Sequence, residues 1–250
     1  MEKTQKEPFN LARKLFHLFG LVIPLVYFFN LLDYLFPAIF KDNTRSWGFF
    51  LLLGLVAILL LVEYLRFRYP FWQNLFLKVA SPLLKDKELG KMHGSIPYIL
   101  GMCLVVGFMP REVAMITGLY LAFGDPTAAY FGGKYGTMRF YNGKSLQGLV
   151  AGIVGGFISS VIFMAWATVY TNSASHLALW NYDGPIWTSW GILFIGSVVA
   201  MALEFISHEG FLDDNLLIPI GAGATITVLL ALFKGEPLFS YFYPLHLLFQ

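Results

Sequence analysis

Residues 121–136 read LAFGDPTAAYFGGKYG, an apolar and glycine-rich stretch with a single carboxylate, Asp125. Four small residues recur at every fourth position and therefore share one face of a helix: Gly124, Ala128, Gly132 and Gly136. Small residues at this spacing let two membrane helices approach closely. A carboxylate beside bare backbone can also hold a cation, while glycine amides accept an anion. The stretch therefore indicates either tight helix packing or a binding site, and Asp125 favours the site.

Pro126 follows this carboxylate and removes one backbone donor. Proline is typical of a helix break or of the first turn of a helix. If a half-helix begins here, its N-terminal amides would face the polar site.

The composition of the whole chain indicates the class of protein to which this stretch belongs. The chain has 250 residues, of which 57% are hydrophobic and only 13% are charged. Soluble domains carry about 25% charged residues. The single cysteine, Cys103, excludes a disulfide framework and a thiolate metal site within the chain. We therefore predict a polytopic, all-α membrane protein.

Apolar stretches near the length of a bilayer span recur along the whole chain. We predict one membrane-embedded domain over residues 1–250, a helix bundle with about seven transmembrane helices plus short interfacial helices. The expected spans are 14–36, 47–66, 95–109, 112–132, 146–170, 186–206 and 214–233. Residues 71–84 are expected to lie in the interface, and residues 238–249 are apolar but short.

Lysine and arginine concentrate in alternate loops, which predicts a cytoplasmic N-terminus. Charged residues then fall near the cytoplasmic ends of several spans: Arg13, Lys14, Glu63, Arg66, Asp125, Lys134 and Glu204. Snorkelling and topology anchoring explain most isolated basic residues. Acidic residues at membrane depth are costly and are usually functional or paired. Because three of them come from different predicted helices, we expect a shared polar site on this side.

A basic loop follows the opening stretch, KYGTMRFYNGKSLQG at residues 134–148. Asn142-Gly143 predicts a turn, and Ser145 is placed to cap the next helix. The Gly-Lys-Ser triplet is not a Walker P-loop, because that motif needs a glycine where Met138 stands. A basic loop before a membrane helix is by itself an ordinary topology signal.

Three further groups of residues are candidates for a site. Arg13, Lys14 and His17 fall together at the start of the first span and form either a phosphate-facing cluster or a structural one. Glu63 and Arg66 are three residues apart, which predicts a local ion pair. The segment 204–221 contains the acidic and amide residues Glu204, Asp213, Asp214 and Asn215. It could form a salt-bridged interface or supply oxygen ligands to Mg²⁺.

Together these residues resemble the CTP-dependent lipid kinases, which include dolichol, phytol and farnesol kinases and the CTP-dependent diacylglycerol kinase. The family is more distantly similar to the CDP-diacylglycerol synthases. The matching residues follow the family order: Arg13-Lys14 with His17, Gly124-Asp125 with Ala128, Gly132 and Gly136, Gly143-Lys144-Ser145 with Gly148, and Glu204 with Asp214-Asn215 and Pro219. Family members commonly have a glutamate where this chain has Gln147.

The resemblance implies transfer of the γ-phosphate of CTP to the hydroxyl of a membrane lipid alcohol, with Mg²⁺ or another divalent cation. The alcohol would be a polyprenol such as dolichol, a phytol-type isoprenoid or a diacylglycerol. The expected catalytic residues are Asp125, Lys144, Arg13, Lys14 and His17. The expected metal ligands are Asp125, Asp214 and Glu204. The expected nucleotide-binding residues are Gly124, Gly132, Gly133, Lys134, Gly136, Gly143, Ser145 and Asn215.

We expect this activity in a bacterial inner membrane or the endoplasmic reticulum, with the bilayer as a partner and without nucleic acid. The nucleotide-site motifs lie in residues 121–148 and 204–221. Two alternatives remain open: a CTP:phosphatidate cytidylyltransferase, which would use the same nucleotide, and a lipid transporter without catalysis. The sequence shows neither a convincing internal repeat nor the Lys-Asp and His-Gly-Gly signatures of the cytidylyltransferases.

Overall fold

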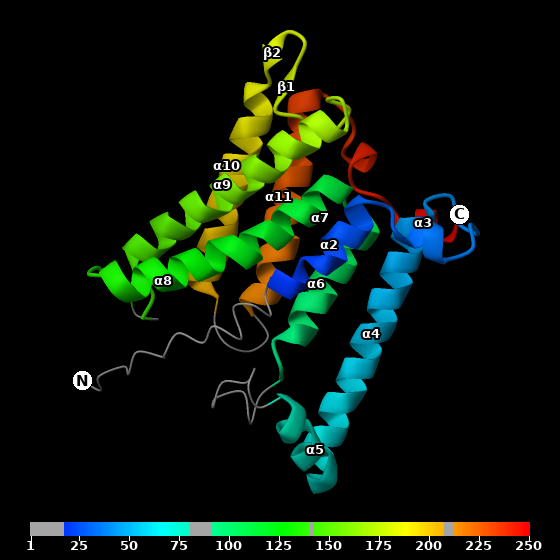
Figure 1. Cartoon of the computed structure of the whole chain (residues 1–250), viewed down its shortest axis with the longest axis vertical. Helices are drawn as coiled ribbons and strands as arrows, with labels where there is room; N and C mark the ends of the chain where they lie inside the picture. The colour runs from blue at the N-terminus through cyan, green and yellow to red at the C-terminus, as the bar shows by residue number, and fades with distance from the viewer. Residues whose placement is uncertain (1–17, 81–91, 141–142, 208–212) are drawn as a thin grey trace.

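The computed structural model describes residues 18–80, 92–140, 143–207 and 213–250. Within these residues the chain is a helical bundle (Figure 1). The helices are α2 (Val22–Phe28), α3 (Leu32–Leu35), α4 (Asn43–Arg68), α5 (Pro70–Ala80), α6 (Ser95–Phe108), α7 (Arg111–Leu119), α8 (Asp125–Tyr135), α9 (Leu146–Tyr170), α10 (Trp187–Ile206) and α11 (Asp214–Lys234). The shorter elements are the π-helical turn η3 (Tyr120–Gly124), the strands β1 (Trp180–Asn181) and β2 (Gly184–Pro185), and the 3₁₀ turns η4 (Leu238–Ser240) and η5 (Leu245–Phe249).

The core of the bundle lies between α6, α7, α10 and α11. Its side chains are fully buried, among them Met102, Val113, Ile116, Met201 and Ile218. The outer faces of α4 and α9 instead expose large apolar side chains such as Leu61 and Ile162. An apolar exterior around a packed apolar core is what a bilayer requires of a membrane protein.

Four helices in the described part of the chain are long and apolar enough to cross a membrane, namely α4, α9, α10 and α11. This agrees with the predicted all-α membrane bundle. The expected spans at 95–109 and 112–132 correspond to the shorter α6 and to the run α7–η3–α8. The count of seven spans therefore stays a prediction. Residues 71–84 were expected in the interface, and α5 covers their described part.

The continuous span expected over residues 14–36 is wrong in its described part. The helix ends at Phe28, and Asn30 adopts a left-handed conformation with φ 55° before the short helix α3. Asparagine is among the residues that tolerate this conformation best. The two-residue strands β1 and β2, which pair antiparallel between α9 and α10, were not predicted either.

The helix break that was one of two predictions for Pro126 is not present, because the backbone stays helical from α7 through η3 into α8. Figure 1 shows α7 and α8 as one continuous rod. Proline in a helix interior lacks a donor and clashes with the carbonyl four residues earlier. A wider π-helical turn accommodates it, and such turns are frequent at functional sites. Pro126 does stand in the first turn of α8.

Small residues bring α8, α9 and α10 close together. A Cβ added at Gly148 of α9 would lie 2.8 Å from the carbonyl oxygen of Ala128 and 3.1 Å from the Cα of Gly132. A Cβ at Gly152 would lie 2.6 Å from the sulfur of Met201 on α10. The four-residue repeat in α8 thus packs against α9, as the small-residue packing mechanism predicts.

This packing predicts that alanine substitutions at two helical glycines differ in their effect on stability. We expect Gly148→Ala to destabilise the protein by about 1–3 kcal/mol, because the added methyl meets backbone atoms that cannot move aside. Gly191→Ala is the matched control, since it also lies in a helix and a Cβ there would meet nothing within 4 Å. Thermal unfolding in detergent measures both. Equal midpoints for the two variants would contradict the close approach of α8 and α9.

Candidate functional site

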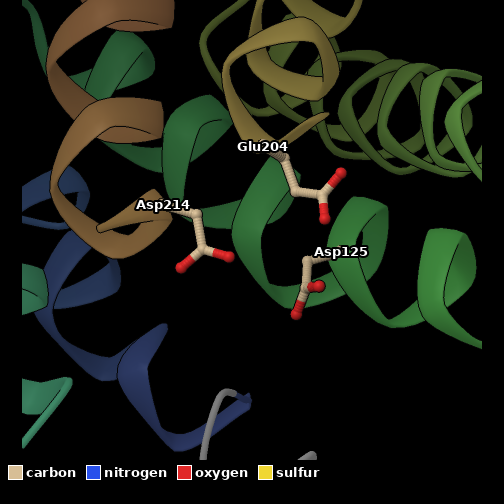
Figure 2. A group of neighbouring side chains, drawn as sticks. All are labelled: Asp125, Glu204 and Asp214. Carbon is tan, nitrogen blue, oxygen red and sulfur yellow. The ribbon is translucent and has the colours of Figure 1, made fainter. Parts of the chain in front are cut away.

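Three carboxylates from three helices meet at one end of the bundle. Asp125 begins α8, Glu204 lies in the last turn of α10 and Asp214 begins α11. Each offers an oxygen, and these oxygens all lie within 4.8 Å of one another. Figure 2 shows the three side chains turned toward a common centre. Glu204 is buried, and the other two are half-buried.

The local sequence explains why the third carboxylate faces this centre. Asp213 caps α11, because its carboxylate accepts hydrogen bonds from the backbone nitrogen of Asn215 at 2.9 Å and from the amide Nδ2 of Asn215 at 2.7 Å. Capping by Asp213 fixes where the helix begins. Asp214, the next residue, then stands in the first turn, where a negative charge is favoured by the helix dipole. Asn215 was expected to bind nucleotide, and its amide donates within this cap.

Lys144 supplies a positive charge beside the carboxylates. Its Nζ lies 2.9 Å from Oε1 of Glu204, donates to Oγ of Ser207 at 3.2 Å, and also contacts the carbonyl oxygen of Glu204. Ser207 donates its hydroxyl to the same carbonyl at 2.7 Å. A lysine ammonium has three donors, so one side chain can hold the end of α10 and pair with its carboxylate.

The loop that carries Lys144 is a short hairpin held by two side chains. Arg139 donates to the carbonyl oxygens of Gly143 at 2.9 Å and of Gly132 at 3.1 Å. Gln147 accepts from the backbone nitrogen of Thr137 at 3.2 Å and donates to its hydroxyl at 2.6 Å. From the sequence, Arg139 was predicted only to belong to a basic loop, and Gln147 only to depart from the family pattern. The structure shows both holding the loop in place.

The remaining expected nucleotide residues fall into two groups. Gly132 and Gly136 lie against Ser145, whose hydroxyl caps α9 by accepting from the backbone nitrogen of Gly148 at 3.1 Å. The capping role predicted for Ser145 is thus confirmed. Gly124 lies against Met201, and Gly143 forms the turn with φ +78°, which glycine adopts without strain. These glycines are therefore explained by packing and by the turn.

Two positions of α8, Gly133 and the exposed Lys134, lie outside this packed interface. A Cβ at Gly133 would meet nothing within 4 Å. Lys134 lies over the rings of Tyr130 and Tyr135, at 5.7 and 5.2 Å from their centroids. Arg13, Lys14 and His17, expected to be catalytic, lie outside the described residues.

Glu63, which we expected in the same polar site, is not one of the three clustered carboxylates. It forms the ion pair predicted with Arg66, with oxygen-to-nitrogen distances of 2.6 and 3.0 Å. Its second oxygen accepts from the backbone nitrogen of His93 at 3.1 Å.

The carboxylate cluster has the chemistry of a hard-cation site. Carboxylates this close repel one another when ionised, and burial strengthens the repulsion. Mg²⁺ is usually held by one or two carboxylates together with substrate phosphates and water. The three oxygens of Asp125, Glu204 and Asp214 fit such an ion, and Lys144 adds a second positive charge at the edge of the cluster.

Comparison with known proteins gives named relatives. The chain is 32% identical over 162 residues to the CTP-dependent diacylglycerol kinase 1 of Schizosaccharomyces pombe, covering 63% of this chain and 70% of that protein. It is 28% identical over 182 residues to the protein of the same name from Saccharomyces cerevisiae, covering 71% and 62%. The Eremothecium gossypii protein of that name is 29% identical over 174 residues, covering 68% and 54%.

The chain thus spans between 54% and 70% of the length of these three relatives. No protein-family model matches the chain, and no solved structure matches it. The identity to the Schizosaccharomyces pombe protein extends over more than two thirds of that relative. The chain belongs to the CTP-dependent lipid kinase family.

Proposed function

We propose that this protein transfers the γ-phosphate of CTP to the hydroxyl of a membrane lipid alcohol, with diacylglycerol as the acceptor. The observation that carries the proposal is the cluster of Asp125, Glu204 and Asp214 with Lys144 at its edge. The relatives' names supply CTP as the donor and favour diacylglycerol over a polyprenol or phytol. The concentration of basic residues in alternate loops supports a site at the cytoplasmic end of the bundle.

Phosphoryl transfer asks a protein mainly to position the reactants and to neutralise charge. The three carboxylates of Asp125, Glu204 and Asp214 would hold Mg²⁺, which would supply positive charge to neutralise the phosphates of the nucleotide. The carboxylates come from three separate helices, so their spacing is set by the packing of α8, α10 and α11 rather than by one loop. Sites built on rigid elements hold their geometry more closely than sites on loops.

Lys144 is placed to contact the phosphates directly. Its side chain is partly exposed, at 28%, while its partner Glu204 is 11% exposed. The ammonium can therefore keep its ion pair with Glu204 and exchange its hydrogen bond to Ser207 for one to an incoming phosphate oxygen. Arg139 and Gln147 fix the hairpin that carries it, so Lys144 meets the nucleotide from a defined direction.

The lipid hydroxyl need not lose its proton before transfer begins. The transition state of most phosphoryl transfers is loose, with little bond formation to the nucleophile. Orientation of the hydroxyl in line with the departing diphosphate therefore contributes more than a strong base.

The function is tested with purified protein and doubly labelled CTP. We expect label from the γ-phosphate to appear in phosphatidate when diacylglycerol is supplied, and cytidine label to stay in CDP. Cytidine label in lipid would instead support the cytidylyltransferase alternative. Lipid movement across sealed vesicles without consumption of CTP would support the transporter.

We expect Asp125→Asn to lower kcat by at least about a hundredfold, because removal of one electrostatic contact at a reacting centre costs about 10²–10³-fold. The neutral amide keeps the size of the side chain, so the thermal midpoint should not fall. Asp183→Asn makes the same change in the exposed turn between β1 and β2 and should keep wild-type turnover. Unchanged turnover in folded Asp125→Asn would contradict the assignment.

Removal of divalent cations should stop turnover, and Mg²⁺ should restore it. Asp214→Asn removes one negative ligand and should raise the Mg²⁺ concentration for half-maximal activity by about tenfold or more. Titration of the initial rate with Mg²⁺ at saturating CTP measures both effects. Full activity of the wild-type protein in excess chelator would show that these carboxylates serve another purpose.

A further inference from the structure

A cavity lies between α4, α5 and the start of α6. It has a volume of about 170 Å³. Its lining residues are Leu59, Val62, Glu63, Phe76, His93, Ser95 and Ile96. Most of the wall is apolar, and the polar groups gather where α4 approaches the start of α6.

The polar end of this cavity is built on a buried ion pair. Glu63 and Arg66 are 7% and 2% exposed, and the Arg66 guanidinium lies over the rings of Phe67 and Phe76 at 4.3 and 4.6 Å. Burying two charges is expensive even when they pair, so such a pair is weak evidence for stability alone. Here Glu63 also accepts from the backbone nitrogen of His93. The pair therefore holds the segment that begins α6.

The same segment adjoins the carboxylate cluster. A Cβ added at Gly94 would lie 3.2 Å from Nδ2 of Asn215, the residue next to Asp214. One side of residues 93–95 thus lines the cavity, and the other contacts the helix start that carries a clustered carboxylate. Within the described residues, the segment 93–95 therefore connects the cavity to the start of α11, where Asp214 lies.

The surroundings of the cavity indicate what class of molecule it takes. Helix α4 is long and apolar enough to cross a membrane, and it ends in Arg66 and Arg68. Helix α5 exposes Phe71 and Trp72, as helices at the membrane interface do. The cavity between them therefore lies where the glycerol backbones of lipids meet the aqueous phase.

The size of the cavity limits the part of the molecule that enters. Pockets for whole drug-sized ligands measure about 300–1,000 Å³. A volume of about 170 Å³ fits a glycerol with its ester groups, while the acyl chains stay in the bilayer. In the described residues, Nδ1 of His93 accepts from the backbone nitrogen of Ser95 at 3.2 Å. His93 and Ser95 therefore place polar side chains in the wall of the cavity, where ester or hydroxyl oxygens would be bound.

We propose that this cavity binds the glycerol end of the diacylglycerol acceptor and presents its hydroxyl toward the carboxylate cluster. The inference rests on the proposed function and adds the acceptor site to it. Leu59, Val62 and Ile96 enclose the apolar part of the headgroup region, and His93 and Ser95 contact its oxygens. CTP reaches the carboxylates from the side of the Lys144 hairpin.

Kinetics of two tryptophan variants test the site. Leu59→Trp fills the cavity and should raise the apparent KM for 1,2-dioctanoylglycerol in mixed micelles by about tenfold or more, since even one methylene in an apolar pocket changes discrimination by about 10–200-fold. Its KM for CTP should stay at the wild-type value. Leu61→Trp is the matched control on the exposed face of the same helix and should keep both values. An unchanged lipid KM in Leu59→Trp, or a raised KM for CTP, would overturn the acceptor site while the wild-type kinase activity stands.

Photolabelling of the wild-type protein gives a second test, whose result does not depend on whether a variant folds. A diacylglycerol with a photoreactive diazirine beside the glycerol ester should label residues 59–63 or 92–96, without CTP. Excess 1,2-dioctanoylglycerol should abolish the label, and excess phosphatidylcholine should not. Labels found only on α9 and α10, or equal competition by the two lipids, would show that the cavity is not the acceptor site.

Discussion

The mutual repulsion of three carboxylates is the constraint on which the functional end of this protein depends. Asp125, Glu204 and Asp214 have oxygens within 4.8 Å of one another, in a place where little water is available to screen them. At such distances the interaction between like charges rises several-fold as the effective dielectric falls. Lys144 offsets part of this cost through Glu204. A divalent cation that binds together with the nucleotide would offset more of the repulsion. We therefore propose that the cluster binds a cation with the nucleotide phosphates.

The helices can hold these charges together because their interfaces are built from small residues and from one wide turn. Gly148 and Gly152 bring α9 against α8 and α10, with backbone atoms in direct contact. The π-helical turn before Asp125 lets Pro126 stand within a continuous helix. The row of small residues that suggested a binding surface in the sequence therefore acts mainly by closing these interfaces. Its effect on the site is indirect but essential, since it sets how far apart the carboxylates lie.

The features of the structure that could be predicted from the sequence are those that leave a recognisable pattern of residues. Acidic residues in apolar segments are rare because their insertion into a membrane costs free energy. Asp125 and Glu204 could therefore be predicted as site residues from the sequence. The ion pair of Glu63 with Arg66 was predicted from their spacing, but the position of Glu63 outside the carboxylate cluster was not, because it depends on how the helices pack. The loop anchors Arg139 and Gln147 were missed for a similar reason. Most of their hydrogen bonds go to backbone atoms, which leave no pattern in a sequence.

The arrangement of the two substrate routes follows from the same helices. Glu63 and Arg66 hold the start of α6 from one side, and Asn215 contacts it from the other. The lipid would therefore approach through apolar walls at α4 and α5, while the nucleotide would approach through the basic hairpin at Lys144. Separate approaches suit a reaction between a water-soluble donor and a membrane-bound acceptor, because neither has to leave its own phase. In this proposal, residues 93–95 join the acceptor cavity to the start of α11, where Asp214 lies. The buried ion pair of Glu63 and Arg66 holds that segment through the backbone nitrogen of His93.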